Sequence, residues 1–114
     1  MAKRNGQREL EELERVFAAL AHASRRQILL VLQFHGGSMT AGEIAARFEC
    51  TWPTTTRHLR QLEQAKLVRV EQAGRARVYR LDAAYLDKVV GRWMRWFASA
   101  ERRSASRHAV VDQQ

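Results

Sequence analysis

Apolar residues recur three or four positions apart through the first third of the chain, which is the spacing of one face of a helix. The pattern predicts a helix over residues 8–21 and a second helix that begins near Ser24, whose hydroxyl can cap the free amides of the first turn. Gly36 and Gly37 follow this second pattern and are typical of a helix end. The apolar positions are Leu10, Leu13, Val16, Phe17, Leu20, Ile28, Leu29, Val31, Leu32 and Phe34.

A short helical pattern comes next. Thr40 and Glu43 have the spacing of a capping box, in which a hydroxyl and a carboxylate satisfy the free amides at a helix start. Ile44, Ala45 and Phe48 supply its apolar side. We therefore expect a third helix that begins after Thr40 and ends in a turn before residue 51.

A fourth helix is expected over residues 51–65, and two starting points fit its sequence. Proline is favoured in the first turn of a helix, but it disfavours helical angles in the residue before it. Either Thr51 caps a helix whose first residue is Trp52, or the helix begins at Pro53.

Alternating apolar and polar residues then replace the helical spacing. Residues 68–71 and 77–81 alternate on either side of Gly74, which predicts a two-stranded β-hairpin with a tight tip. Asp82 can cap a last helix that carries most of the aromatic side chains, and the chain becomes polar from Arg102 onward.

These elements predict one domain that is mainly α with a small β-hairpin. A chain of 114 residues has room for one modest core. We expect the domain to span residues 8–101, with a flexible N-terminus at 1–7 and a flexible C-terminal tail at 102–114.

The fourth helix has one apolar face and one face suited to nucleic acid. Thr55, Leu59 and Leu62 share the face expected to pack inward. The other faces carry hydroxyls, guanidinium groups and amides, and no carboxylate precedes Glu63. Such groups hold phosphates and read base edges, although a solvated helix face has a similar composition. The candidate DNA contacts are Thr51, Trp52, Pro53, Thr54, Thr56, Arg57, His58, Arg60 and Gln61.

Two of these candidates have an alternative interpretation. His58 can donate to a phosphate, or it can be an ordinary surface histidine. Trp52 can stack on a sugar or contact a thymine methyl group, or it can pack against its own domain.

The charge distribution supports the same region. The formal net charge is +8, which suits an anionic partner such as nucleic acid or a membrane face. Between residues 51 and 80 there are seven Lys and Arg residues but only two Glu residues. The hairpin carries Arg69, Arg75, Arg77 and Arg80. Its guanidinium groups, Arg69, Arg75 and Arg77 above all, are expected to reach the DNA backbone or the minor groove rather than form a solvated charged turn.

The candidate ligands for a metal ion do not form a set. They are one cysteine, Cys50, and four histidines, none of which pair at the spacing of a zinc or arsenic site: His22, His35, His58 and His108. We expect no metal and no cofactor. Cys50 is expected to be a buried thiol, with a redox switch next to the fourth helix as the alternative.

The combination of motifs resembles the ArsR/SmtB family of winged helix-turn-helix regulators over residues 14–82. The residues that carry the resemblance are Phe17–His22, Arg25–Leu29, Met39–Ala45, Thr54–Arg60, Leu62–Glu63, Leu67–Val68, Gly74–Arg75 and Val78–Tyr79. The resemblance implies a winged helix-turn-helix with five helices that binds operator DNA as a homodimer. It also implies that base contacts come from Trp52, Pro53, Thr56 and Arg57, and that helices 8–21 and 83–101 form the dimer.

The chain departs from the family in three places. Lys66 stands where many members have glycine, and left-handed backbone angles there would cost roughly 1 kcal/mol. Trp52 and Pro53 stand where members often have small polar residues, which implies a different operator preference. The paired cysteines, or the histidine and carboxylate sets, of metal-sensing members have no counterpart here.

The aromatic last helix is expected to form the dimer, with a small-molecule pocket as the alternative. An apolar stripe on an isolated helix favours association. The predicted dimerisation residues are Leu10, Leu13, Phe17, Tyr85, Leu86, Val89, Val90, Trp93, Trp96 and Phe97.

We therefore predict a sequence-specific DNA-binding regulator, a repressor in the cytoplasm, whose partners are double-stranded DNA and a second copy of the chain. The alternatives are a winged-helix protein-interaction module and a thiol-responsive repressor that uses Cys50. No paired carboxylates, activated nucleophile or glycine-rich phosphate loop indicates an enzyme. No membrane span or secretory signal is predicted. The operator sequence, the regulated genes and the effector are not predicted.

Overall fold

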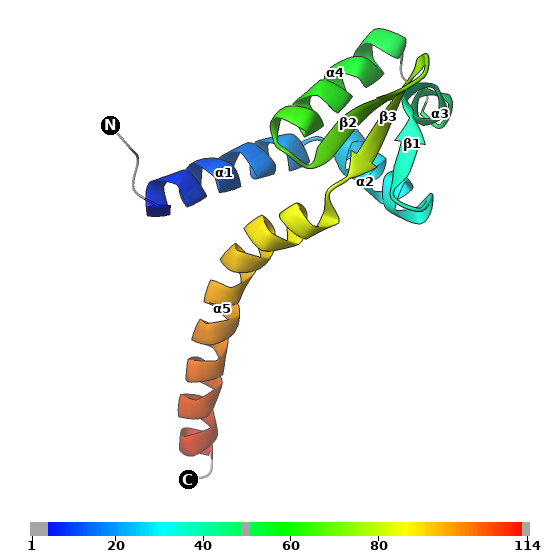
Figure 1. Cartoon of the computed structure of the whole chain (residues 1–114). Helices are drawn as coiled ribbons and strands as arrows, with labels where there is room; N and C mark the ends of the chain where they lie inside the picture. The colour runs from blue at the N-terminus through cyan, green and yellow to red at the C-terminus, as the bar shows by residue number, and fades with distance from the viewer. Residues whose placement is uncertain (1–4, 49–50, 113–114) are drawn as a thin grey trace.

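The computed structural model describes residues 5–48 and 51–112, with side chains described for residues 6–48 and 51–98. Within this part of the chain, five helices and a small antiparallel sheet form the winged helix-turn-helix architecture (Figure 1). The helices are α1 (Asn5–Leu20), α2 (Ala23–Phe34), α3 (Ala41–Ala46), α4 (Trp52–Gln64) and α5 (Ala83–Asp112).

The sheet holds the predicted hairpin and one strand that the sequence did not indicate. The strands are β1 (Ser38–Thr40), β2 (Val68–Ala73) and β3 (Ala76–Leu81), in the order β1-β3-β2. Ala73 pairs with Ala76 across the tip, where Gly74 has a φ of 62°. The backbone at the tip therefore adopts left-handed angles that favour glycine. β1 is too short to show alternation, and it exists as a strand because Met39 pairs with Tyr79 of β3.

The start of α2 differs from the prediction. The expected cap by Ser24 is wrong: the N-cap residue is His22, which makes no side-chain capping bond. The amides of Arg25 and Arg26 donate to the carbonyl oxygen of His22. Separately, Arg25 donates from Nε to the carbonyl oxygen of Ala19 at 2.7 Å, and Arg26 donates from Nη1 to that of Leu20 at 2.6 Å. These guanidinium groups satisfy carbonyls left free at the end of α1, so the junction is closed by side chains of α2.

Three other predicted helix boundaries are confirmed: the start of α3, the end of α2 and the start of α5. Both bonds of the capping box between Thr40 and Glu43 are present at the start of α3. The amide of Gly37 donates to the carbonyl of Leu32 at 2.7 Å and closes the end of α2. Asp82 accepts from the amide of Tyr85 at 3.0 Å and caps α5.

α5 is longer than predicted. It continues past the boundary expected at residue 101 and ends at Asp112. The added segment contains no glycine or proline and is rich in alanine and arginine, which favour helix. α1 likewise begins at Asn5 rather than at residue 8. Among the helices described, none combines the length and apolar character that a bilayer crossing requires.

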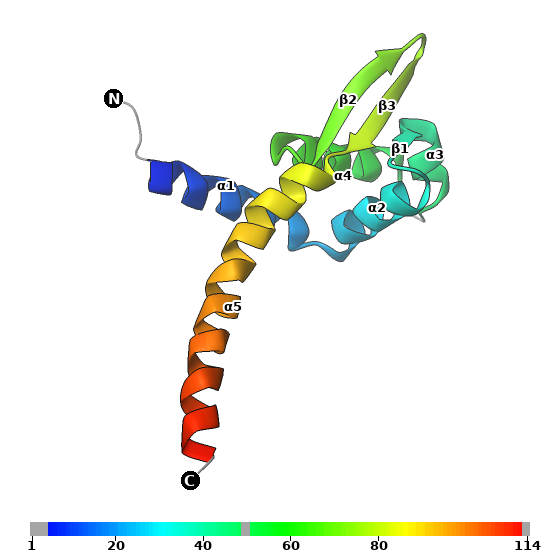
Figure 2. The same cartoon turned by 60° about the horizontal axis from the view of Figure 1, so that its bottom comes forward.

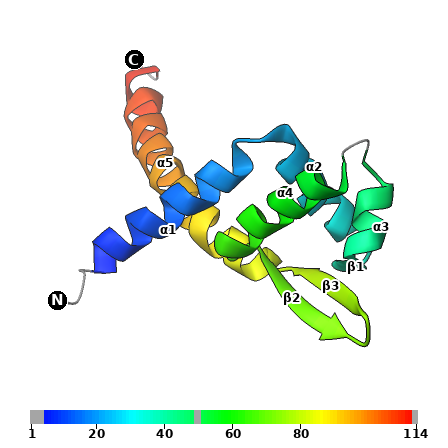
Figure 3. The same cartoon turned by 90° about the horizontal axis from the view of Figure 1, so that it is seen from above.

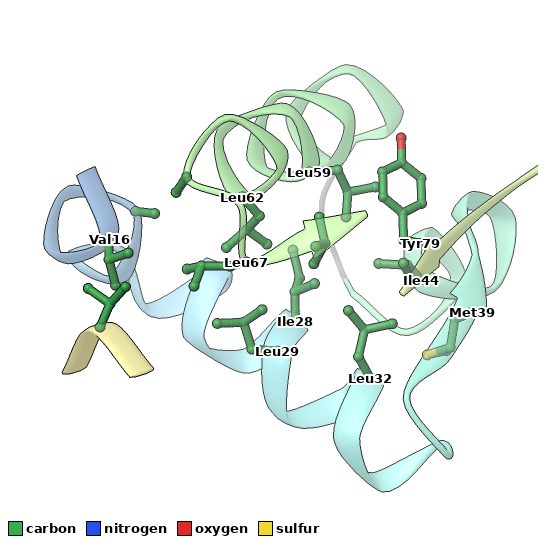
Figure 4. Packing of buried hydrophobic residues seen from close by; sticks show 14 residues of the cluster. Val16, Ile28, Leu29, Leu32, Met39, Ile44, Leu59, Leu62, Leu67 and Tyr79 are labelled. Atoms are coloured by element: carbon green, nitrogen blue, oxygen red, sulfur yellow. The ribbon is translucent and has the colours of Figure 1, made fainter. Parts of the chain in front are cut away.

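One hydrophobic core joins the elements (Figure 4). Leu32 of α2, Ile44 of α3 and Leu62 of α4 are each fully buried, and Leu67 and Tyr79 connect them to the sheet. α4 lies across α2 on one side of this core (Figure 3). The hairpin and α5 extend from the body in different directions (Figure 2). The core therefore holds α4 and the hairpin side by side with their outer surfaces uncovered.

Candidate nucleic-acid interface

The start of α4 is set by Thr51. Its hydroxyl oxygen accepts from the amide of Thr54 at 3.3 Å, and Thr51 has extended backbone angles. Trp52 is the first helical residue and Pro53 the second, which decides between the two starting points that the sequence allows. Pro53 lies where a missing N–H leaves no intrahelical bond unmade.

The two faces of α4 are divided as predicted. Thr55, Leu59 and Leu62 are buried, and the Thr55 hydroxyl donates to the carbonyl of Thr51 at 3.2 Å. The predicted contact residues are all at least partly accessible. Three of them are half-buried: Thr54, Thr56 and His58. The others are exposed: Thr51, Trp52, Pro53, Arg57, Arg60 and Gln61.

His58 lies at the inner edge of this surface. Its ring centroid is 5.9 Å from that of His22, and its Nδ1 is buried without a hydrogen-bond partner. Burial lowers the pKa of His58, and the charges of Arg25, His22 and Arg57 lower it further. The imidazole is therefore neutral at pH 7, so it contributes no fixed positive charge to the surface.

Lys66 forms the turn between α4 and the hairpin. It has a φ of 65° and is the one described non-glycine residue with a positive φ. The amide of Leu67 donates to the carbonyl of Leu62 at 3.0 Å and closes the helix in the way that usually requires glycine. Lys66 therefore does adopt the left-handed backbone angles that would favour glycine.

The hairpin arginines do not all lie on the same face of the hairpin. Arg77 pairs in register with Gln72, on the face that also carries Val70 and Tyr79. Arg69 pairs with Arg80, on the opposite face, because successive side chains of a strand alternate. Arg80 is bound to Glu71 at 3.1 Å, which neutralises part of that face. The structure thus separates Arg69 from Arg77, while Arg75 lies at the tip.

A second exposed surface lies on α1 and α5 and is apolar. Trp93 packs edge-on against Phe17 with centroids 5.0 Å apart, and Arg92 holds Glu9 at 3.2 Å. These contacts join α5 to α1 within the chain. The apolar residues of α5 that remain most exposed are Trp96 (72%), Phe97 (58%) and Met94 (55%).

The structure bears on two apolar residues of α5. Val89 is only 1% exposed because it packs into its own core, so it cannot contact a partner. Met94, which is not in the predicted dimerisation set, is exposed, and the helical pattern alone did not show this because it does not give the rotation of α5 against α1. Met94 borders a surface pocket of about 380 Å³ with Leu20, Leu86 and Val90.

The candidate metal ligands do not form a site in the part of the chain that the structure describes. No group of three or more His, Cys, Asp or Glu side chains converges there. His22 and His58 come together but have Arg25 beside them, and His35 contacts Glu43 at 3.5 Å. Cys50, the candidate redox thiol, lies outside the described residues, as does the side chain of His108.

Comparisons with known proteins agree with this geometry. A helix-turn-helix domain model matches residues 20–71. The chain is 35% identical over 82 residues to the transcriptional repressor SdpR of Bacillus subtilis, covering 72% of this chain and 88% of that protein. It is 38% identical to an HTH-type transcriptional regulator of Mycobacterium tuberculosis, covering 60% and 63% of the two chains.

Solved structures give the same answer. An ArsR-like transcriptional regulator from Rhodococcus sp. RHA1 superposes with a TM-score of 0.72 at 32% identity, over 85% of this chain and 90% of that one. The homodimeric winged helix-turn-helix DNA-binding domain of a possible ArsR-family regulator from Mycobacterium bovis superposes with a TM-score of 0.61 at 25% identity, over 92% and 91%. This chain belongs to the ArsR family of winged helix-turn-helix transcriptional regulators.

Proposed function

We propose that this protein is a cytoplasmic repressor that binds a two-fold symmetric operator as a homodimer. The observation that carries the proposal is the outer face of α4, which exposes Arg57, Arg60 and Gln61, together with the projecting hairpin that carries Arg75 at its tip. The N-terminal residues of such a helix contact base edges in the major groove, and a neighbouring wing contacts the backbone.

The proposed DNA contacts come from two elements, α4 and the hairpin. Thr51, Trp52, Pro53, Thr54, Thr56, Arg57, His58, Arg60 and Gln61 form the proposed helix contacts. Arg75 and Arg77 form the proposed wing contacts, and Arg69 is left out because it shares the opposite hairpin face with the Glu71–Arg80 pair. Of the helix set, Arg57 is the best candidate for a guanine edge, because a guanidinium group can bind O6 and N7 together.

The homodimer is proposed to form through the apolar surface of α1 and α5. Leu86, Val90, Met94 and Phe97 recur along one side of α5. Trp96 and Leu10 extend the exposed apolar area on the side of α1. A dimer covers this area and sets the spacing of two copies of α4.

The test is recovery of DNA fragments from the genome with purified protein, followed by gel shifts over a range of salt concentrations. We expect one or a few fragments to bind far more tightly than random duplex. The affinity should fall with salt at a slope near 0.9 per contacted phosphate. Retention of no fragment, or an affinity unaffected by salt, would favour a winged-helix protein-interaction module instead.

A further inference from the structure

Trp52 is an apolar side chain on an otherwise polar surface. In the part of the chain described, it is the one large hydrophobic residue that α4 leaves exposed, with 55% of its surface accessible. The remaining exposed large apolar residues lie on the α1–α5 surface or on α2, where Leu30 and Phe34 are found. An indole in this place differs from its neighbours and calls for a separate explanation.

The helix start does not need the indole. Thr51 supplies the capping oxygen and also donates its hydroxyl to that of Thr54 at 2.9 Å. Pro53 supplies the preferred first-turn backbone. Trp52 is therefore free of the capping role, and more than half of its surface gains nothing from the core.

The position of Trp52 limits what can cover it. In the proposed complex with DNA, the first turn of α4 enters the major groove, where the side chains of that turn meet base edges. Base edges there offer hydrogen-bond donors and acceptors, and thymine alone among the four standard bases adds a methyl group, at C5. The apolar face of the indole gains from contact with that methyl, whereas only its single N–H can bind a polar edge.

We propose that Trp52 determines operator preference by apolar contact with the C5 methyl group of a thymine. This inference rests on the proposed function and names the base that this part of the site reads. Arg57 lies more than one helical turn further along α4 and contacts a different base pair.

The test compares thymine with uracil in a DNA fragment that the wild-type protein has retained. Uracil lacks only the C5 methyl and keeps the hydrogen-bonding groups of thymine. We expect replacement of the contacted thymine to weaken wild-type binding about fourfold, the effect of one buried methyl group. In Trp52→Ala the thymine and uracil fragments should bind within about 1.5-fold of each other, as expected when no apolar side chain meets the methyl.

Three further variants separate the methyl contact from other roles. Trp52→Phe keeps an apolar ring but has no indole N–H. Most of the loss of affinity caused by replacing thymine with uracil, the uracil penalty, should therefore remain. Arg57→Ala should bind more weakly and keep the full penalty. Phe34→Ala removes another exposed aromatic ring, 85% accessible and located on α2, and should behave as the wild type in every arm.

Each result that differs from these expectations would overturn a specific part of the proposal. A wild-type protein that binds thymine and uracil fragments equally excludes the methyl contact but leaves DNA binding intact. An undiminished penalty in Trp52→Ala assigns the methyl to another residue. Loss of the penalty in Trp52→Phe overturns the expectation that any apolar ring at this position is enough, and shows that the wider indole is needed to reach the methyl. Failure of the wild type to retain any DNA contradicts the proposed function itself.

Discussion

The two exposed surfaces of this protein lie on helices that share one core, yet they are built from opposite kinds of side chain. α4 exposes guanidinium groups, amides and hydroxyls, with Trp52 as its apolar exception. α5 exposes Met94, Trp96 and Phe97. Polar groups suit a partner that offers phosphates and base edges, and apolar groups suit a partner that excludes water. Residue type, more than exposure, therefore separates the proposed DNA surface from the proposed dimer surface.

The largest expected effect comes from placing a charge on the apolar surface. Met94→Glu should convert the dimer to a monomer, because a carboxylate would be buried in the interface. Loss of the second half-site contact should lower operator affinity by about 100-fold. Sedimentation equilibrium and gel shifts measure the two effects.

The matched control for this variant is Phe34→Glu, which places the same charge on an exposed aromatic position outside α5. It should remain a dimer and bind the operator normally. A Met94→Glu protein that sediments as a dimer would show that the subunits associate through another surface.

Substitutions on the polar surface should separate specificity from general affinity. Arg57→Ala should cost about 1–3 kcal/mol on the operator and much less on random duplex, because it removes a base contact. Arg75→Ala should weaken both kinds of DNA by a similar factor and reduce the salt slope by about 1. Fluorescence anisotropy on both duplexes distinguishes these patterns.

Arg69→Ala is the control for Arg75→Ala, because it removes the same charge from the same hairpin. Its side chain lies on the opposite face from Arg77, so a smaller loss than in Arg75→Ala is expected. Equal losses from Arg69→Ala and Arg75→Ala would mean that the hairpin contributes only its net charge.

The turn between α4 and the hairpin can be changed without altering either surface. Lys66→Gly relieves left-handed strain of about 1–2 kcal/mol but adds freedom to the unfolded chain. The free energy of unfolding should rise by about 0.5–1 kcal/mol in urea titrations. Dimerisation should not change, and operator affinity should fall only by the small loss of one distant positive charge.

The smallest effect is a pH dependence at the inner edge of α4. The pKa of His58 is below its ordinary value of 6.5 in the folded protein, so below pH 6.5 the unfolded chain binds a proton more readily. The free energy of unfolding should therefore fall as the pH drops below 6.5, until the pH passes the lowered pKa of His58.

His58→Gln should make the same curve flatter between pH 7.5 and 5.5. Glu43 does not interfere in this range, because its pKa is lowered from 4.5 by hydrogen bonds to the amide and hydroxyl of Thr40. A curve that is identical in His58→Gln and wild type would show that another group causes the pH dependence.

The sequence alone determined the features that depend on near neighbours. The capping box at Thr40, the cap of Asp82, the glycine tip of the hairpin and the buried face of α4 were predicted correctly. Each depends on residues within a few positions of one another, so spacing in the chain is enough to indicate it.

Only the tertiary structure decided the features that depend on packing between distant segments. β1 needs β3 as its partner. The backbone carbonyl of His22, and not the Ser24 hydroxyl, accepts from the amides of Arg25 and Arg26, whose guanidinium groups bind the last carbonyls of α1. The rotation of α5 against α1 buries Val89 and leaves Met94 outside. The register of β2 and β3 likewise places Arg69 and Arg77 on opposite faces. Helix rotation and strand pairing follow from which surfaces the core covers, and a single helical or alternating pattern does not contain that information.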